Sequence, residues 1–296
     1  MISYFQAVVI GLLQGVTELF PISSLGHSVL LPAWLGWDNL VKAQSAQESF
    51  YLAFVVALHV ATAIALLVYF RRDWVRIIGG FFATLRTRRI ETADERMAWL
   101  LVVASVPTGV LGLAFEHSLR TLFAKPLAAA VFLTVNGFIL LAGERYRRRA
   151  AVRSLAAPAE GADSPTEHGR RLDTLDFKEA GAIGVAQAGS LFAGVSRSGI
   201  TMVAGLARGL DHEDAARFSF LLATPIIFAA GVYKVPDLFG HLGDGIRSQA
   251  VVGAICAGAA AYLSVSFLVR FFQTRTLTPF AIYCLIVGVA SVVRFA

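Results

Sequence analysis

Two short polar strings lie inside apolar sequence and carry most of the side chains that could do chemistry. The first is Pro-Ile-Ser-Ser-Leu-Gly-His at residues 21–27, and the second is Gly-Val-Ser-Arg-Ser-Gly-Ile-Thr at residues 194–201. Each interrupts a stretch that would otherwise form membrane-embedded helix. Because an unsatisfied polar group at that depth is costly, such groups persist mainly where they line a site. The two strings therefore predict one shared polar site.

The second string has the composition of a phosphate-binding loop. Its glycines let backbone N–H groups converge at the start of a helix, whose N-terminus adds positive potential. Arg197 adds a planar fork of donors suited to phosphate, and Ser196, Ser198 and Thr201 add hydroxyl groups. The alternative is a structural turn whose arginine pairs with a buried acid. We favour the anion site, because an arginine at membrane depth is rarely without a function.

The first string supplies complementary groups. His27 can act as a nucleophile or as a general acid or base near neutral pH. Ser23 and Ser24 are candidate N-caps for the helix that begins near His27, which is their purely structural interpretation. Upstream, Gln14 and Glu18 share one helical face at the i, i+4 spacing. The string and its upstream helix thus offer hydroxyls, an imidazole and a carboxylate.

Glu18 requires a partner, because a lone intramembrane carboxylate needs a cation. That cation is Arg197, a divalent metal or a proton. A simple Glu18–Arg197 pair that holds the two strings together is an open alternative, and it is compatible with catalysis.

The composition is that of an integral membrane protein. Hydrophobic residues make up 56% of the chain and charged residues 16%, with a mean hydropathy of +0.66; soluble domains carry roughly 25% charged residues. The net charge of +6 invites a nucleic-acid partner. We exclude that class because the basic residues cluster between apolar spans, where they act as topology signals.

Six apolar segments are long enough to cross a bilayer, namely residues 52–70, 97–115, 126–143, 216–234, 249–270 and 278–295. Two further regions, about 4–35 and 177–208, are broken by the polar strings, so we expect re-entrant helical hairpins there. Placing the arginine-rich loops in the cytoplasm puts 19 Lys and Arg residues inside and six outside. Both termini then lie on the outer face.

The two broken regions are related by an offset of 173 residues. This offset pairs alanine, isoleucine, glycine, glutamine and serine with their like, as Gln14 with Gln187 and Ser23 with Ser196. Each unit is one hairpin followed by three spans, so the second must be inverted, an architecture typical of transporters. We predict an all-α polytopic membrane protein made of repeat 1 (1–143), a cytoplasmic linker (144–176) and repeat 2 (177–296).

The motifs resemble one known family along nearly the whole chain outside the linker. The segments that carry the resemblance are GLLQGVTELFPISSLGH at 11–27, ALHVATAIALLVYF at 57–70, GVSRSGITMVAGLARGL at 194–210 and FSFLLATP at 218–225. They resemble the BacA-type undecaprenyl-diphosphate phosphatases. The resemblance implies removal of the terminal phosphate of a polyprenyl diphosphate at the outer face of the bacterial inner (plasma) membrane. It also implies recycling of the lipid carrier for peptidoglycan synthesis, and bacitracin resistance.

Carried over by motif, the resemblance implies an acidic element at Gln14 and Glu18 that binds Mg²⁺ or Ca²⁺. Ser23, Ser24 and His27 match a second family element, in which Ser24 and His27 are the expected catalytic groups and Ser23 an expected substrate ligand. Ser196, Arg197 and Thr201 match a third element and are expected phosphate ligands. Two positions depart from the family pattern. Gln14 stands at a Glu-or-Gln position, so metal binding rests more on Glu18, and Ala193 stands where the family usually has proline.

As a mechanism we favour Ser24 as the nucleophile, assisted by His27, ahead of a phosphohistidine and of direct attack by water. The rival function is a secondary transporter or lipid flippase, since paired hairpins also build carrier sites. For His59, inside an apolar span, a role in helix packing is favoured over a supporting role at the site. Small-residue runs such as residues 257–261 permit close helix packing without identifying the partner, so the oligomeric state is open and a homodimer is one alternative.

Overall fold

The computed structural model describes residues 2–44, 50–123, 125–156, 170–240 and 243–296, and these ranges are built from helices. Within them, six helices are long and apolar enough to cross a membrane. They are α4 (Phe50–Tyr69), α6 (Ala93–Phe123), α7 (Pro126–Ala156), α10 (His212–Lys234), α11 (Arg247–Phe271) and α12 (Thr278–Phe295). The prediction of an all-α protein with six spans is confirmed.

Each broken region folds as a helical hairpin. The first contains α1 (Tyr4–Thr17) and α2 (Ser24–Trp34), and the second contains α8 (Phe177–Gln187), the 3₁₀ turn η2 (Ala188–Leu191) and α9 (Arg197–Ala207). Helix α1 packs against α2, and α8 packs against α9. The polar strings form the tips where each chain reverses.

Several elements differ from the sequence-based expectation. Helix α7 continues to Ala156, well past the predicted end of its span at residue 143, because the sequence contains no helix breaker before Pro158. The first part of the predicted linker is therefore helical, and residues 157–169 lie outside the described residues. The short helices α3 (Asp38–Gln44) and α5 (Arg71–Thr87) and the 3₁₀ turns η1 (Leu172–Thr174) and η3 (Val235–Leu238) were not predicted.

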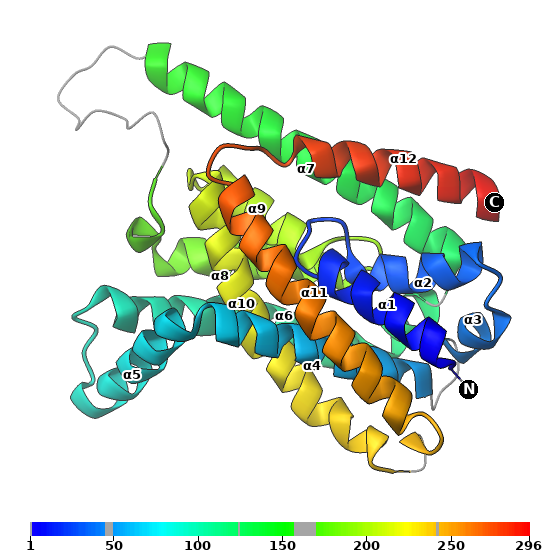
Figure 1. The fold of residues 1–296 in the computed structure, drawn as a ribbon. Helices are drawn as coiled ribbons and strands as arrows, with labels where there is room; N and C mark the ends of the chain where they lie inside the picture. The colour runs from blue at the N-terminus through cyan, green and yellow to red at the C-terminus, as the bar shows by residue number, and fades with distance from the viewer. Residues whose placement is uncertain (1, 45–49, 124, 157–169, 241–242) are drawn as a thin grey trace.

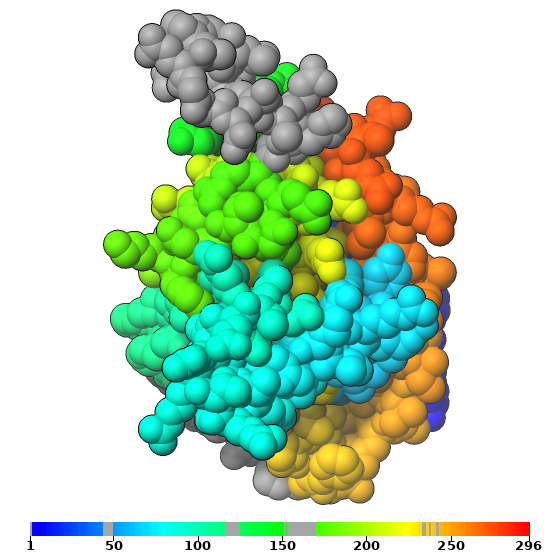
Figure 2. Space-filling model, turned by 90° about the vertical axis from the view of Figure 1, so that its left-hand side faces the viewer, coloured from blue at the N-terminus to red at the C-terminus, as the bar shows by residue number. Residues whose placement is uncertain are grey.

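The two termini lie toward one end of the molecule, and α5 lies at the opposite end together with both flanks of the predicted linker (Figure 1). We call this opposite end the arginine-rich end, because residues 71–96 and 145–171 carry most of the arginines. Figure 2 looks onto it and shows α5, in cyan, at the surface. This arrangement agrees with the threading in which both arginine-rich loops share one side of the membrane.

Equivalent glycines of the two hairpins make equivalent close contacts. A Cβ atom at Gly11 of α1 would lie 2.4 Å from the carbonyl oxygen of Gly253 in α11. A Cβ atom at Gly184 of α8 would lie 2.4 Å from the carbonyl oxygen of Ala104 in α6. The 173-residue offset relates these glycines. The first helix of each hairpin therefore packs against the second of the three spans that follow the other hairpin. The inverted relation of the two units stays a prediction.

The small-residue run at 257–261 is used inside the chain. Ala257 and Ala261 are fully buried, and a Cβ atom at Gly15 of α1 would clash with the carbonyl oxygen of Ala257. The buried residues of this run explain a close contact between α1 and α11 within one chain, and the homodimer stays a prediction.

Candidate functional site

The starts of two helices meet where the hairpin tips touch. Helix α2 begins at Ser24 and α9 begins at Arg197, and the preceding serines cap them. The Ser23 hydroxyl accepts from the N–H of Gly26 and also from the N–H of Gly194 in the other tip, both at 3.2 Å. Since the first N–H groups of a helix have no acceptor within it, two positive helix ends lie close together. Such a place suits an anion.

Glu18 lies at the centre of this region and is only 6% exposed. Its Oε1 accepts a hydrogen bond from Nη2 of Arg197 at 2.6 Å. Its Oε2 accepts from Oγ of Ser24 at 2.5 Å and from Nε2 of Gln14 at 2.9 Å. One carboxylate thus joins the predicted nucleophile, on one tip, to the predicted phosphate ligand, on the other.

Arg197 has a donor to spare. Its side chain is 14% exposed, and its Nη1 is buried without a hydrogen-bond partner in the described part of the chain. A buried donor left unpaired costs free energy, so it persists where a ligand supplies the acceptor. The Glu18–Arg197 pair is therefore present as the structural alternative expected, and the guanidinium still offers one face to an anion.

His27 is directed away from the Ser24 hydroxyl. Its Nδ1 lies 2.7 Å from the carbonyl oxygen of Ser23, and its Nε2 lies 2.9 Å from the hydroxyl of Tyr283 in α12. The two rings also stack, with centroids 5.7 Å apart. Both ring nitrogens are thus engaged, and the proton of Ser24 faces Glu18. The geometry favours Glu18 over His27 as the group that assists Ser24.

The hydroxyls of the second tip are engaged in holding the tip itself. Ser196 Oγ caps α9 through the N–H of Gly199 and lies 3.0 Å from Ser198 Oγ, which donates to the carbonyl of Phe20. Thr201 bonds the carbonyl of Arg197 and the hydroxyl of Ser219, at 2.8 and 2.6 Å. Their role as phosphate ligands stays a prediction, whereas their role in shaping the tip is visible in these bonds.

Sequence reasoning missed two residues of this region. Asn136 of α7 donates from Nδ2 to the carbonyl of Pro21 and accepts at Oδ1 from the N–H of Ser196, both at 3.0 Å. Asn136 therefore connects both tips to one span. An asparagine within an apolar span is the sequence feature that could have identified it, and the structure shows it fully buried. Tyr283, which contacts His27, could not be singled out from the sequence, because tyrosine is common where spans meet the membrane–water interface.

Gln14 and Glu18 do not make a resident metal site by themselves. Both oxygens of Glu18 face N–H or O–H donors, and Gln14 turns its amide nitrogen toward Glu18. Among the described residues, no group of three or more His, Cys, Asp or Glu could hold a metal ion. With both oxygens of Glu18 engaged by hydrogen bonds, these two side chains do not hold a divalent cation by themselves, and Mg²⁺ sites of this kind are completed by water and substrate phosphates.

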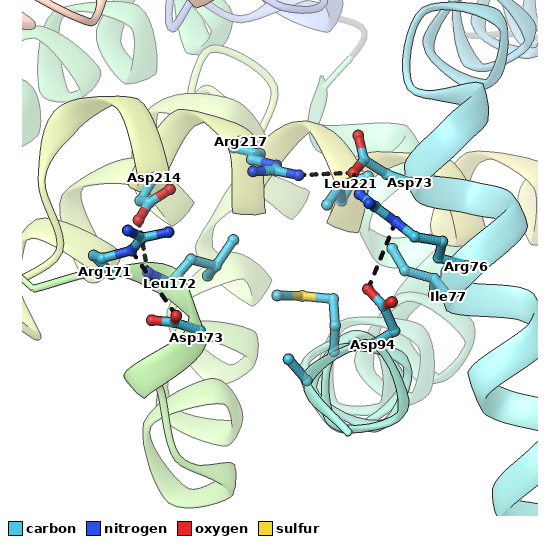
Figure 3. A pocket seen from close by; sticks show the side chains of 12 residues that line it. Asp73, Arg76, Ile77, Asp94, Arg171, Leu172, Asp173, Asp214, Arg217 and Leu221 are labelled. Carbon is cyan, nitrogen blue, oxygen red and sulfur yellow. Dashed lines mark hydrogen bonds and ion pairs between the residues drawn. The ribbon is translucent and has the colours of Figure 1, made fainter. Parts of the chain in front are cut away.

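A second polar cavity, of about 140 Å³, lies at the arginine-rich end (Figure 3). Its charges are matched within the protein: Asp73 accepts from Arg217 at 2.7 Å and from Arg76 at 2.6 Å, and Asp214 accepts from the N–H of Leu172. Its lining comes from α5, α6, the segment around η1 and α10, with no residue from either tip. This cluster connects the segment after the linker to α5.

The base of the second hairpin is closed by an ion pair at the same end. Arg170 donates to both carboxylate oxygens of Glu179, at 2.7 and 3.2 Å, and to the carbonyl of Arg208 at 3.0 Å. The hydrogen bonds from Arg170 hold the pKa of Glu179 below its ordinary value. The start of α8 and the end of α9 are thereby held together, which fixes the tip at their far end.

Comparison with known proteins assigns the chain that contains this site to a family. The family model described as bacitracin resistance protein BacA matches residues 7–290. The chain belongs to the BacA family. A BacA-family relative called undecaprenyl-diphosphatase 2, from Frankia alni, is 58% identical, with 100% of this chain and 98% of that protein covered. An undecaprenyl-diphosphatase of Mycolicibacterium paratuberculosis is also 58% identical with the same coverage.

The similarity extends to more distant BacA-family proteins. An undecaprenyl-diphosphatase 2 of Chromobacterium violaceum is 43% identical, with 97% of this chain and 96% of that protein covered. These alignments cover 97–100% of this chain.

Proposed function

We propose that this BacA-family chain is an undecaprenyl-diphosphate phosphatase, which releases inorganic phosphate and leaves undecaprenyl phosphate. The observation that carries the proposal is the Glu18 carboxylate, which holds Ser24 on one oxygen and Arg197, with its spare buried donor, on the other. The names of the relatives supply the substrate. A carrier or flippase would need the anion site but not a hydroxyl bonded to a buried carboxylate.

In the proposed chemical step, Oγ of Ser24 attacks the terminal phosphorus in line. Its proton passes to Oε2 of Glu18, which already accepts it in a hydrogen bond. The bond from the terminal phosphorus to the bridging oxygen breaks, and the electron pair leaves with undecaprenyl phosphate. Arg197 and the N-termini of α2 and α9 stabilise the charge that develops on the phosphoryl oxygens.

The second step releases phosphate from the serine. Glu18 first passes the proton that it took from Ser24 to the departing undecaprenyl phosphate and is a carboxylate again. Water then attacks the phosphoseryl phosphorus, Glu18 takes a proton of that water, and Oγ of Ser24 leaves and is reprotonated by Glu18. The net reaction consumes one water for each diphosphate. His27 and Tyr283 bond each other beside the first tip, and we assign them to holding the start of α2 rather than to proton transfer.

The divalent cation, Mg²⁺ or Ca²⁺, is best treated as part of the substrate. The charges of Glu18 and Arg197 cancel, so the tips alone cannot balance a diphosphate. We therefore propose that the cation arrives on the diphosphate oxygens, with Glu18 and the Gln14 carbonyl able to complete its ligands.

We place the reaction at the outer face of the bacterial inner membrane. The excess of basic residues at the arginine-rich end supports a cytoplasmic location for that end, and the first hairpin then enters from the opposite side. The isoprenoid tail would lie among the spans. If the chain also forms a homodimer, Ala257 and Ala261 lie outside the contact, because they are buried within the chain.

The test is phosphate release from undecaprenyl diphosphate by the purified chain in detergent, with and without EDTA. We expect metal-dependent turnover that Ser24→Ala lowers by at least about 10³-fold, as for loss of a nucleophile. Ser266→Ala is the matched control, because its hydroxyl only bonds the carbonyl of Tyr262 in the same helix. Tight binding of the lipid without turnover would support the carrier instead.

A further inference from the structure

A third element reaches the carboxylate at the centre of the site. His59 lies in the middle of α4, and its Nε2 is 3.2 Å from Oε2 of Glu18, the oxygen that also accepts from Ser24. Its Nδ1 is 2.8 Å from the carbonyl oxygen of Val55, one turn earlier in the same helix. The imidazole is therefore held at one nitrogen by its own helix and contacts the site with the other.

The partner of each nitrogen fixes what the ring can do. A carbonyl oxygen only accepts, so Nδ1 carries a hydrogen and donates it to Val55. A carboxylate oxygen also prefers a donor, so a hydrogen lies between Nε2 and Oε2 of Glu18. His59 thus supplies a hydrogen bond to Glu18 from an anchored position. Gln14 contacts the same oxygen, but it lies on α1 and moves with Glu18.

A second histidine–carboxylate pair in the chain shows what a purely structural pair looks like. His212 contacts Glu144 through Nε2 at 2.6 Å, and its Nδ1 accepts from Arg147 at 2.8 Å. Glu144 also accepts from the backbone N–H of Leu277. This pair joins α7, α10 and the start of α12, and within the described part of the chain its carboxylate accepts no hydrogen bond from a side-chain hydroxyl. The Glu18 carboxylate, in contrast, holds Ser24 and Arg197.

We propose that His59 is a positioning residue for the reaction at Ser24. It fixes the plane of the Glu18 carboxylate relative to α4, so that Oε2 faces the Ser24 hydroxyl while Oε1 stays on Arg197. Two donors on different helices restrict rotation of the carboxylate more than either one alone, which keeps the acceptor aligned in the transition state. This inference rests on the proposed phosphatase activity and extends it to α4.

The test compares kcat and KM for undecaprenyl diphosphate among the wild type, His59→Ala and His59→Gln. We expect His59→Ala to lower kcat by about tenfold or more while KM stays within about twofold, because an interaction made in the transition state is lost. Glutamine keeps an N–H donor, so His59→Gln is expected to recover most of kcat. The control His212→Ala is expected to lower the thermal stability in detergent and to leave kcat unchanged.

Three results would overturn the inference: wild-type kcat in His59→Ala, an equal loss of kcat in His59→Gln, or an equal loss in His212→Ala. The first means that α4 does not position Glu18, the second that a donor at residue 59 is not what matters, and the third that the effect is general destabilisation. If His59→Ala fails to fold, His59→Leu takes its place, because leucine keeps the bulk of the side chain and lacks the donor. A failure of the proposed phosphatase function would be distinguished from a failure of this inference, because the wild type itself would then release no phosphate.

Discussion

The two hairpin tips share a backbone plan and differ at one side chain that decides their chemistry. In each, a serine caps the inner helix and accepts from the N–H of a glycine three residues later, Ser23 from Gly26 and Ser196 from Gly199. The next residue is Ser24 in one tip and Arg197 in the other. Both of these side chains bond Glu18, one on each oxygen. The equivalent positions of the two tips thus carry the proposed attacking group, Ser24, and the proposed phosphate ligand, Arg197.

The comparison separates the residues that shape a tip from the residue that carries its chemistry. The capping serine and the glycine are kept in both because a helix start needs a side-chain acceptor and, here, a close approach of the other tip. The first helical residue is free to differ, since its backbone is fixed by the cap and its side chain points outward from the helix start. Three predictions test this division.

The largest effect is expected at Arg197. Arg197→Ala removes the spare donor and the charge, and should lower kcat/KM by about 10³-fold or more, as for loss of an arginine that stabilises a transferring phosphoryl group. Arg197→Lys keeps the charge but not the planar fork, so it should recover only part of the loss. Phosphate release measures both. Arg76→Ala, at the arginine-rich end, is the control, and unchanged activity in Arg197→Ala would remove the anion site from the second tip.

A smaller effect, on the stability of the fold, is expected at the two glycines where the first helix of each hairpin packs closely against a span. Gly11→Ala and Gly184→Ala each place a methyl group against a backbone carbonyl that cannot move away easily. Each should destabilise the chain by about 1–3 kcal/mol, the usual cost of overpacking. Thermal unfolding in detergent checks this, with Gly79→Ala, which meets open space, as the control. Very unequal losses would argue that the two hairpins are not seated equivalently.

The smallest effect should separate the two caps. Ser23 has φ of +71° and Ser196 has φ of −80°. Loss of either capping hydroxyl costs about 1 kcal/mol. Alanine is further strained at the positive φ, whereas glycine is relieved there, so alanine should destabilise more than glycine at residue 23. At residue 196 the order should be the same, because glycine is the better N-cap, but the difference should be smaller. Unfolding midpoints of the four variants test it, and an equal difference at both positions would contradict the comparison.

Much of the fold could be predicted because it follows from local pattern. Six apolar runs and two runs broken by polar strings determine the spans and the hairpins, since only helices satisfy their own backbone in lipid. The end of α7 was misjudged because charge ends a span but not a helix, and the arginines after residue 143 are good helix formers. The amphipathic helix α5 was overlooked because it is too polar to count as a span.

The amino-acid sequence by itself determined which groups gather in this protein: a serine–histidine string, a serine–arginine string, and one carboxylate a turn upstream. Those identities are readable because polar residues are rare in apolar sequence. Only the tertiary structure decided how the groups pair. It turned His27 toward Tyr283, brought His59 from α4 to Glu18, and used Asn136 to join the tips. Pairing between elements far apart in the chain depends on helix rotation and depth, and a spacing along one sequence does not encode either directly.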